Sequence, residues 1–110
     1  MKAYKKFWFE ASHTLPDNPQ VHGHSYLVTV WVATSASSPV SLAAFKTLEW
    51  QLHRFVDHTH LNDKIPSPTM ESIAAYLMDK GRQLIRLQNI NVDLISIDVE
   101  RPSLDFGVVT

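Results

Sequence analysis

Three of the six histidines in this 110-residue chain have a spacing that could hold a metal ion. His22 and His24 flank Gly23 at the start of an apolar, strand-like segment. Residues two apart in a strand point to the same face, so both imidazoles can converge on one ion, and Gly23 leaves the space between them free. His13 ends the preceding strand-like segment and joins them if the two segments form a hairpin. Three neutral imidazoles with an open fourth position are typical of catalytic zinc, although imidazole also suits copper, iron or nickel.

Two further groups could take part in acid–base chemistry or ligand binding. Asp57 precedes His58 at the end of a predicted helix, and a carboxylate beside an imidazole can tune proton transfer near neutral pH. The same pair is also explained as a helix C-terminus with a favourable cation. Glu100 ends a predicted strand, where it can accept two hydrogen bonds from an amidine-like edge or simply be solvated. His53 and His60 are interpreted as structural or solvent-facing, and His-x-His could itself be two surface histidines.

The periodicity of the apolar residues predicts the elements that would position these side chains. Alternation at period two predicts strands, and apolar residues three to four apart predict helices. The predicted elements are strand Tyr4–His13, strand His22–Ala33, helix Leu42–Val56, a helix N-capped by Thr69 that runs to about Leu87, strand Asn91–Glu100 and strand Leu104–Val109. The residues predicted to face inward from the helices are Leu42, Phe45, Leu48, Leu52 and Phe55 in the first, and Met70, Ile73, Leu77 and Leu84 in the second. The polar segment Asp57–Pro68 is predicted to be a connecting loop.

This ββααββ order predicts an α+β fold with a single domain over residues 1–110. Two helices can cover only one face of a four-stranded antiparallel sheet, so the other face and both edges stay open in a monomer. We therefore expect a homo-oligomer in which the sheets close into a barrel.

Composition excludes several other classes of protein. Ten basic and eleven acidic residues give a net charge of -1, and there is no basic cluster beyond Lys5 and Lys6, which argues against a nucleic-acid partner. The absence of cysteine excludes disulfides, thiolate zinc sites and a cysteine nucleophile. The chain shows neither a signal-peptide pattern nor a membrane-spanning apolar run, so we expect no membrane partner and a cytoplasmic location.

Five segments, taken together and in order, resemble the 6-pyruvoyl-tetrahydropterin synthase family, whose members include the 6-carboxytetrahydropterin synthase of queuosine biosynthesis. The matching segments are Phe9-Glu10-Ala11-Ser12-His13-Thr14-Leu15, Val21-His22-Gly23-His24-Ser25-Tyr26, Asp57-His58-Thr59-His60-Leu61-Asn62-Asp63, Pro68-Thr69-Met70-Glu71-Ser72-Ile73-Ala74 and Val99-Glu100. They span nearly the whole chain.

The resemblance implies a T-fold (tunnelling fold), in which trimers form a strand barrel and two trimers commonly stack into a hexamer. It also implies a lyase that acts on 7,8-dihydroneopterin triphosphate or a related pterin, bound at a subunit interface. Zinc would polarise the side-chain hydroxyls, and proton transfers would follow. Carried over residue by residue, the roles are zinc ligands for His13, His22 and His24, the pterin-ring anchor for Glu100, pocket residues for Thr69 and Glu71, and proton transfer for His58 polarised by Asp57.

The chain departs from the family pattern at one catalytic position. The family's catalytic cysteine lies four residues before the first histidine of His-x-His, and here that position is Asn18. An amide does not titrate, so Asn18 cannot replace a thiolate. Asp17 stands one residue away, and a one-residue shift of the loop could bring its carboxylate inward. The acidic-aromatic pair usual at the start of the first helix is here Ser41-Leu42.

Three hypotheses about function remain open at this point. The first is an active zinc-dependent pterin lyase that uses His58 and Asp17. The second is a pterin-binding homologue without the standard synthase activity. The third is a structural oligomer that zinc holds together, since a fold alone does not fix a function.

Overall fold

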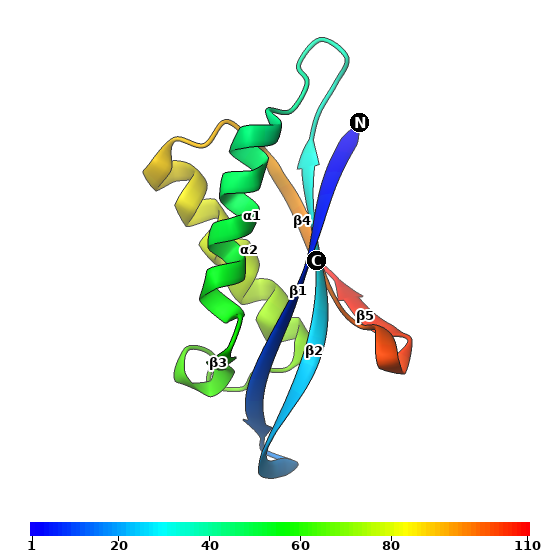
Figure 1. The fold of residues 1–110 in the computed structure, drawn as a ribbon, viewed down its shortest axis with the longest axis vertical. Coiled ribbons are helices and arrows are strands. Elements are labelled where there is room, and N and C mark those ends of the chain that lie inside the picture. The colour runs from blue at the N-terminus through cyan, green and yellow to red at the C-terminus, as the bar shows by residue number, and fades with distance from the viewer.

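A computed structural model describes all of residues 1–110. Its elements are β1 (Lys2–Leu15), β2 (Asn18–Ala33), α1 (Leu42–Val56), β3 (Thr59–His60), a 3-10 turn (Leu61–Asp63), α2 (Met70–Gln88), β4 (Leu94–Arg101), a second 3-10 turn (Pro102–Leu104) and β5 (Phe106–Val109). The strands form one sheet in the order β3-β1-β2-β4-β5. Both helices lie on the same side of this sheet (Figure 1). The predicted α+β class and the helix layer are therefore confirmed.

The long β1–β2 hairpin forms because both strands alternate in the expected phase. Phe7, Phe9 and His13 are buried, whereas Trp8 and Glu10 on the other face are exposed. The two strands pair antiparallel, and the register shifts only near the turn that follows His13. This pairing places the end of β1 opposite the start of β2.

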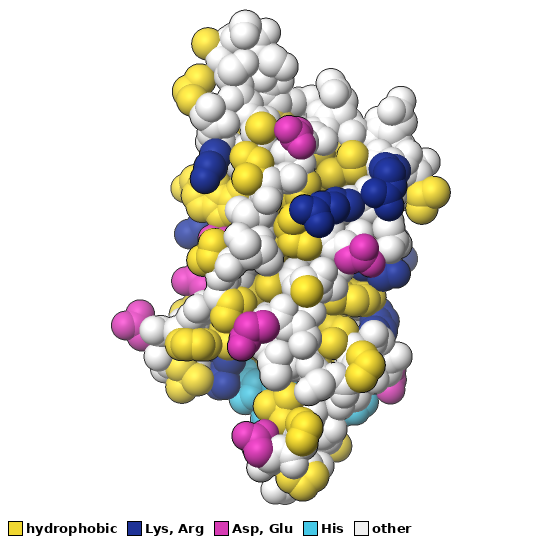
Figure 2. All heavy atoms as spheres, turned by 180° about the vertical axis from the view of Figure 1, so that it is seen from behind, with side chains coloured by type: hydrophobic (Ala, Val, Ile, Leu, Met, Phe, Trp, Pro, Cys, Tyr) yellow, Lys and Arg dark blue, Asp and Glu magenta, His cyan; other side chains and the backbone are white.

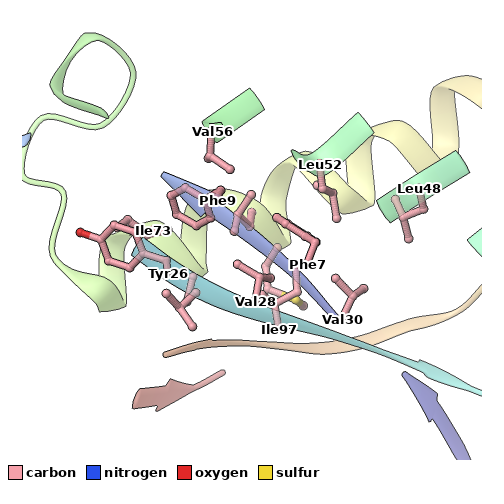
Figure 3. Close-up of a cluster of buried hydrophobic side chains, with 14 of the residues drawn as sticks. Phe7, Phe9, Tyr26, Val28, Val30, Leu48, Leu52, Val56, Ile73 and Ile97 are labelled. Atoms are coloured by element: carbon pink, nitrogen blue, oxygen red, sulfur yellow. The ribbon is translucent and has the colours of Figure 1, made fainter. Parts of the chain in front are cut away.

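The core lies between one face of the sheet and the two helices (Figure 3). Tyr26 and Val28 of β2 are almost fully buried, and the ring of Tyr26 stacks on Phe9 of β1 at 4.8 Å between centroids. Leu48 and Leu52 of α1 are fully buried on the same side. Burial of these side chains is the main stabilising term that holds the helices on the sheet.

Both helices begin at the polar caps that the sequence provides. The Ser41 hydroxyl accepts the N–H of Ala44, and the Thr69 hydroxyl accepts the N–H of Ser72. One predicted inward residue is wrong: Leu42 is 58% exposed, because the first turn of α1 extends past the buried cluster. Among the other predicted inward residues, Phe55 and Met70 are partly buried and the rest are buried.

The segment predicted as a plain loop, Asp57–Pro68, contains a further strand. Residues 59 and 60 form β3, which pairs with β1 in parallel at Ala11 and Ser12. The sheet is therefore five-stranded rather than four-stranded. Asn62 fixes this segment because its amide bonds the N–H, the carbonyl and the hydroxyl of Thr14. A segment that lies on the edge of a sheet must satisfy its backbone groups there.

The face of the sheet opposite the helices carries large side chains that remain exposed. Tyr4 is 55% exposed and Trp8 is 54% exposed. Most of the outer edge of β1 has no partner strand, because β3 pairs with only two of its residues, and β5 forms the other edge. The chain measures 50 × 30 × 18 Å, and its hairpin extends beyond the helices (Figure 1). Open strand edges of this kind favour pairing with another chain.

Candidate active site

Strand pairing brings His13, His22 and His24 together at the hairpin end of the sheet. His13 is directly opposite His22, and His24 lies two residues further along the same face. The ring centroids are 4.5 to 5.0 Å apart, and one ligand atom from each residue lies within 4.8 Å of the others. From behind, histidine side chains reach the surface in the lower part of the molecule, where Figure 1 shows the hairpin (Figure 2).

Hydrogen bonds fix which nitrogen of two rings faces the centre. His13 Nδ1 lies 3.0 Å from the carbonyl of Pro68, and His22 Nδ1 lies 2.8 Å from the carbonyl of Gln20. A carbonyl only accepts, so both Nδ1 atoms carry the proton and both Nε2 atoms carry the lone pair. These two Nε2 atoms are only 2.9 Å apart. Two lone pairs at this distance require a cation between them, either a proton or a metal ion, so the donor set fits a zinc ion.

The environment keeps two of the imidazoles neutral. Burial lowers the pKa of His24 to about 4, with further contributions from the charges of Arg101, His13 and His22. Burial also lowers the pKa of His13, against the opposing effect of its hydrogen bond to the Pro68 carbonyl. Neutral imidazole is the form that binds metal. The site therefore presents His13 and His24 in the ligand form at neutral pH.

Gly23 does not act as expected from the sequence. Its neighbours His22 and His24 point to the helix side, so a side chain at position 23 would point to the opposite face. A Cβ there would lie 3.2 Å from the carbonyl oxygen of Ala11. The glycine thus allows close approach of β1 and β2, and does not keep space between the imidazoles.

A cavity of about 460 Å³ opens beside the three histidines. Besides the histidines, it is lined by Asp17, Asn18, Thr69 and Glu71, to which the family pattern also draws attention. It is also lined by residues for which the sequence suggested no role in the site: Leu15, Tyr26, Met70, Arg101, Leu104 and Phe106. Arg101 could have been found from strand alternation, because it shares a face with the core residues of β4, opposite to Glu100.

Asp57 and His58 form a hydrogen-bonded pair at the edge of β1. His58 Nδ1 donates to Asp57 Oδ2 at 2.7 Å, which leaves Nε2 as the basic nitrogen. Glu10 holds the pair, since its N–H donates to Asp57 Oδ1 at 3.0 Å and its carbonyl accepts the His58 N–H at 2.7 Å. Partial burial would raise the pKa of Asp57, but the hydrogen bonds from Glu10 and His58 and the charges of His53 and His58 lower it.

The imidazole of His58 is strongly exposed and its backbone is unusual. Its side chain is 81% exposed, and its φ of 55° lies in the left-handed region that few residues other than glycine occupy. It lines a second cavity of about 550 Å³ together with Glu10, Ser12, Ser25 and His60. His60 Nδ1 and the Ser12 hydroxyl share a hydrogen bond of 2.9 Å, so His60 is not merely a solvent-facing loop residue.

One chain does not bring all the predicted site residues together. The Asp57–His58 pair does not line the cavity of the three histidines, and neither does Glu100. Glu100 pairs with Leu27 and Gly107 and lies on the open face of the sheet, because Val99 beside it is buried under the helices. His24 lines both cavities, but its ring packs against Tyr26 on the helix side. The predicted site is thus divided between the two faces of the sheet.

Comparison with known proteins identifies the family. A sequence model described as 6-pyruvoyl tetrahydropterin synthase matches residues 2–105. This chain belongs to the 6-pyruvoyl tetrahydropterin synthase family. It is 38% identical to a 6-carboxy-5,6,7,8-tetrahydropterin synthase from Synechocystis sp., in a match that covers 70% of this chain and 71% of the relative.

Solved structures of the family share the fold. The 6-pyruvoyl tetrahydropterin synthase of Caenorhabditis elegans is 19% identical with a TM-score of 0.80, and the match covers 100% of this chain and 94% of that one. A Plasmodium vivax 6-pyruvoyltetrahydropterin synthase, solved with its catalytic glutamate replaced by alanine, is 14% identical with a TM-score of 0.68 over 100% and 97% of the two chains. The predicted T-fold is thereby confirmed. None of the helices is long and apolar enough to cross a membrane.

Proposed function

We propose that this protein is a zinc-dependent lyase that processes 7,8-dihydroneopterin triphosphate or a closely related pterin. The observation that carries the proposal is the pair of Nε2 lone pairs of His13 and His22, which lie 2.9 Å apart in the lining of a cavity. Family membership and the named activity of the Synechocystis relative support the reaction class. A cytoplasmic location and a role in queuosine biosynthesis belong to the same proposal.

Each group in the cavity has a chemical task in this proposal. Zinc bound by His13, His22 and His24 would supply Lewis acidity to the side-chain hydroxyls of the pterin. Thr69 and Glu71, at the start of α2, line the same cavity and would brace the pterin. His58 Nε2 would accept and return the proton, because Asp57 holds the opposite nitrogen protonated. Glu100 would accept two hydrogen bonds from the amidine-like edge of the ring.

Because these groups are divided between two faces of the sheet, the proposed reaction would need more than one chain. The Asp57–His58 pair and Glu100 face away from the three histidines, so a neighbouring chain would supply them. The open edges of β1 and β5 and the exposed Trp8 favour such an assembly. We therefore propose a homo-oligomer, a trimer or a hexamer, with active sites between subunits.

The missing cysteine leaves the identity of one proton-transfer group to be established. Asp17 and Asn18 both line the cavity of the three histidines. We propose that Asp17 takes the place of the thiol. In the Plasmodium vivax relative a catalytic residue is a glutamate, which supports the idea that a carboxylate can serve in the chemistry of this family. The alternative, a pterin-binding protein without the standard activity, is favoured by the asparagine at position 18.

The test is incubation of zinc-loaded protein with 7,8-dihydroneopterin triphosphate, with products resolved by chromatography and mass spectrometry. We expect a 6-pyruvoyl, 6-carboxy or hydroxymethyl product that is lost in His58→Ala and reduced in Asp17→Asn. An Arg86→Gln variant, on the exposed side of α2, provides the control. Pterin binding without any product would reject the lyase in favour of the alternative. Unchanged turnover in Asp17→Asn would reject only the role of that carboxylate.

A further inference from the structure

Arg101 places a cation without a carboxylate partner in the cavity of the three histidines. It lines this cavity, and its Nε is buried without a hydrogen-bond partner. None of the ion pairs in the chain includes Arg101. A buried N–H of a charged group that lacks an acceptor is costly, so this guanidinium is suited to a ligand that supplies one.

The geometry of β4 fixes where this side chain points. Arg101 is the last residue of β4, and it follows the inward-facing Val99 by two positions. Pairing with Phe106 of β5 holds its backbone, and Pro102 ends the strand directly after it. The guanidinium is therefore presented from a strand rather than from a mobile loop. This favours selective recognition of a ligand.

The charge of Arg101 acts on the predicted metal ligands themselves. It contributes to the lowered pKa values of His13 and His24, after the larger effect of burial. The carboxylates of Asp17 and Glu71 line the same cavity, but neither forms an ion pair with Arg101. With a divalent ion on the histidines, two positive groups would face one space and would repel unless an anion lay between them.

We infer that Arg101 binds an anionic group, a phosphate or a carboxylate, on the side chain of the substrate. The identity of that substrate as a pterin rests on the proposed function. A guanidinium binds such groups through two parallel hydrogen bonds. The site would therefore select pterins with a charged side chain over neutral ones, and Arg101 would be a residue that determines specificity.

The experiment is a calorimetric titration with three probes: 7,8-dihydroneopterin triphosphate, neutral 7,8-dihydroneopterin and inorganic triphosphate. The variants are Arg101→Gln, Arg101→Lys and, as a matched control, Arg86→Gln on the exposed side of α2. Titrations of zinc-loaded and metal-free protein separate chelation of zinc by triphosphate from binding to the protein. The melting temperature of each variant checks that it folds.

We expect Arg101→Gln to bind both triphosphate probes about 10- to 100-fold more weakly, with less than about a twofold change for the neutral pterin. The affinity of Arg101→Lys for the triphosphate probes should lie between those of the parent and Arg101→Gln. The affinity of Arg86→Gln should match that of the parent. Equal binding of triphosphates by Arg101→Gln and the parent would overturn the inference, and so would an equal loss for all three probes. If the parent bound 7,8-dihydroneopterin triphosphate no more tightly than inorganic triphosphate, the proposed function would instead be refuted, while inorganic triphosphate would still decide the role of Arg101.

Discussion

Removal of one imidazole should weaken zinc binding by about the contribution of one ligand. His22→Ala deletes one of the two Nε2 lone pairs that lie 2.9 Å apart. Structural zinc sites with four protein ligands contribute about 10–16 kcal/mol, or roughly 3 kcal/mol per ligand. Loss of one ligand should therefore raise the Kd for zinc on the order of 100-fold.

The same loss should be visible in thermal stability. Zinc at about 100 times its Kd stabilises a folded protein by about 2.7 kcal/mol. For a chain of 110 residues, each kcal/mol raises Tm by about 4 °C. The parent should thus gain about 11 °C at that zinc concentration, and His22→Ala only about 2 °C.

The assay is competition with a chromophoric chelator, with metal content measured by mass spectrometry and Tm measured in parallel. His58→Ala is the matched control, because its imidazole is 81% exposed and lies outside the cluster. It should bind zinc like the parent. Equal zinc affinity in His22→Ala and the parent would refute the assignment of the metal site.

Three further predictions follow from particular contacts. His24 is protonated near pH 6.5 in the unfolded chain but only near pH 4 in the folded chain. As the pH falls from 6.5 to 4, the free energy of unfolding of the metal-free protein should therefore decrease, by no more than about 2 kcal/mol because solvent screens a partly exposed imidazole, and that of His24→Gln should decrease less. Equal decreases in chemical denaturation would contradict this. Asn62→Ala removes the bonds to Thr14 at 2.8 to 3.0 Å and should cost about 1–3 kcal/mol by urea denaturation, whereas an unchanged midpoint would show that these bonds do not stabilise the fold. In light scattering, Trp8→Glu on the open face should dissociate the proposed oligomer, because it would bury a charge in the interface, whereas Trp50→Glu, 57% exposed on α1, should leave it intact. An assembly that tolerates Trp8→Glu must use another surface.

Local patterns in the sequence were sufficient for most of the fold. Alternation along β1 predicted its buried face, and the caps Ser41 and Thr69 marked where the helices begin. The short strand β3 was missed because two polar residues, Thr59 and His60, carry no periodicity. They pair with β1 only because the rest of the chain brings them to its edge.

The candidate site was predictable in part. The convergence of His13 with His22 follows from a hairpin, which local pattern predicts. The position of Glu100 on the open face follows from its alternation with the buried Val99, but its distance from the histidines depends on the width of the sheet. Alternation places Arg101 on the inward face of β4, but a single arginine at a strand end is usually solvated, so only the cavity identifies it as a residue of the site.

The most direct test of a site shared between subunits is a mixture of two inactive variants. His22→Ala would keep an intact Asp57–His58 pair, and His58→Ala would keep the intact metal ligands. After unfolding and joint refolding in equal amounts, random assembly should give up to about one quarter of the parent's pterin turnover, because half of the sites have intact metal ligands and half of those meet an intact pair. Turnover no higher than that of the separate variants, in mixed oligomers verified by native mass spectrometry, would contradict a site built from neighbouring chains.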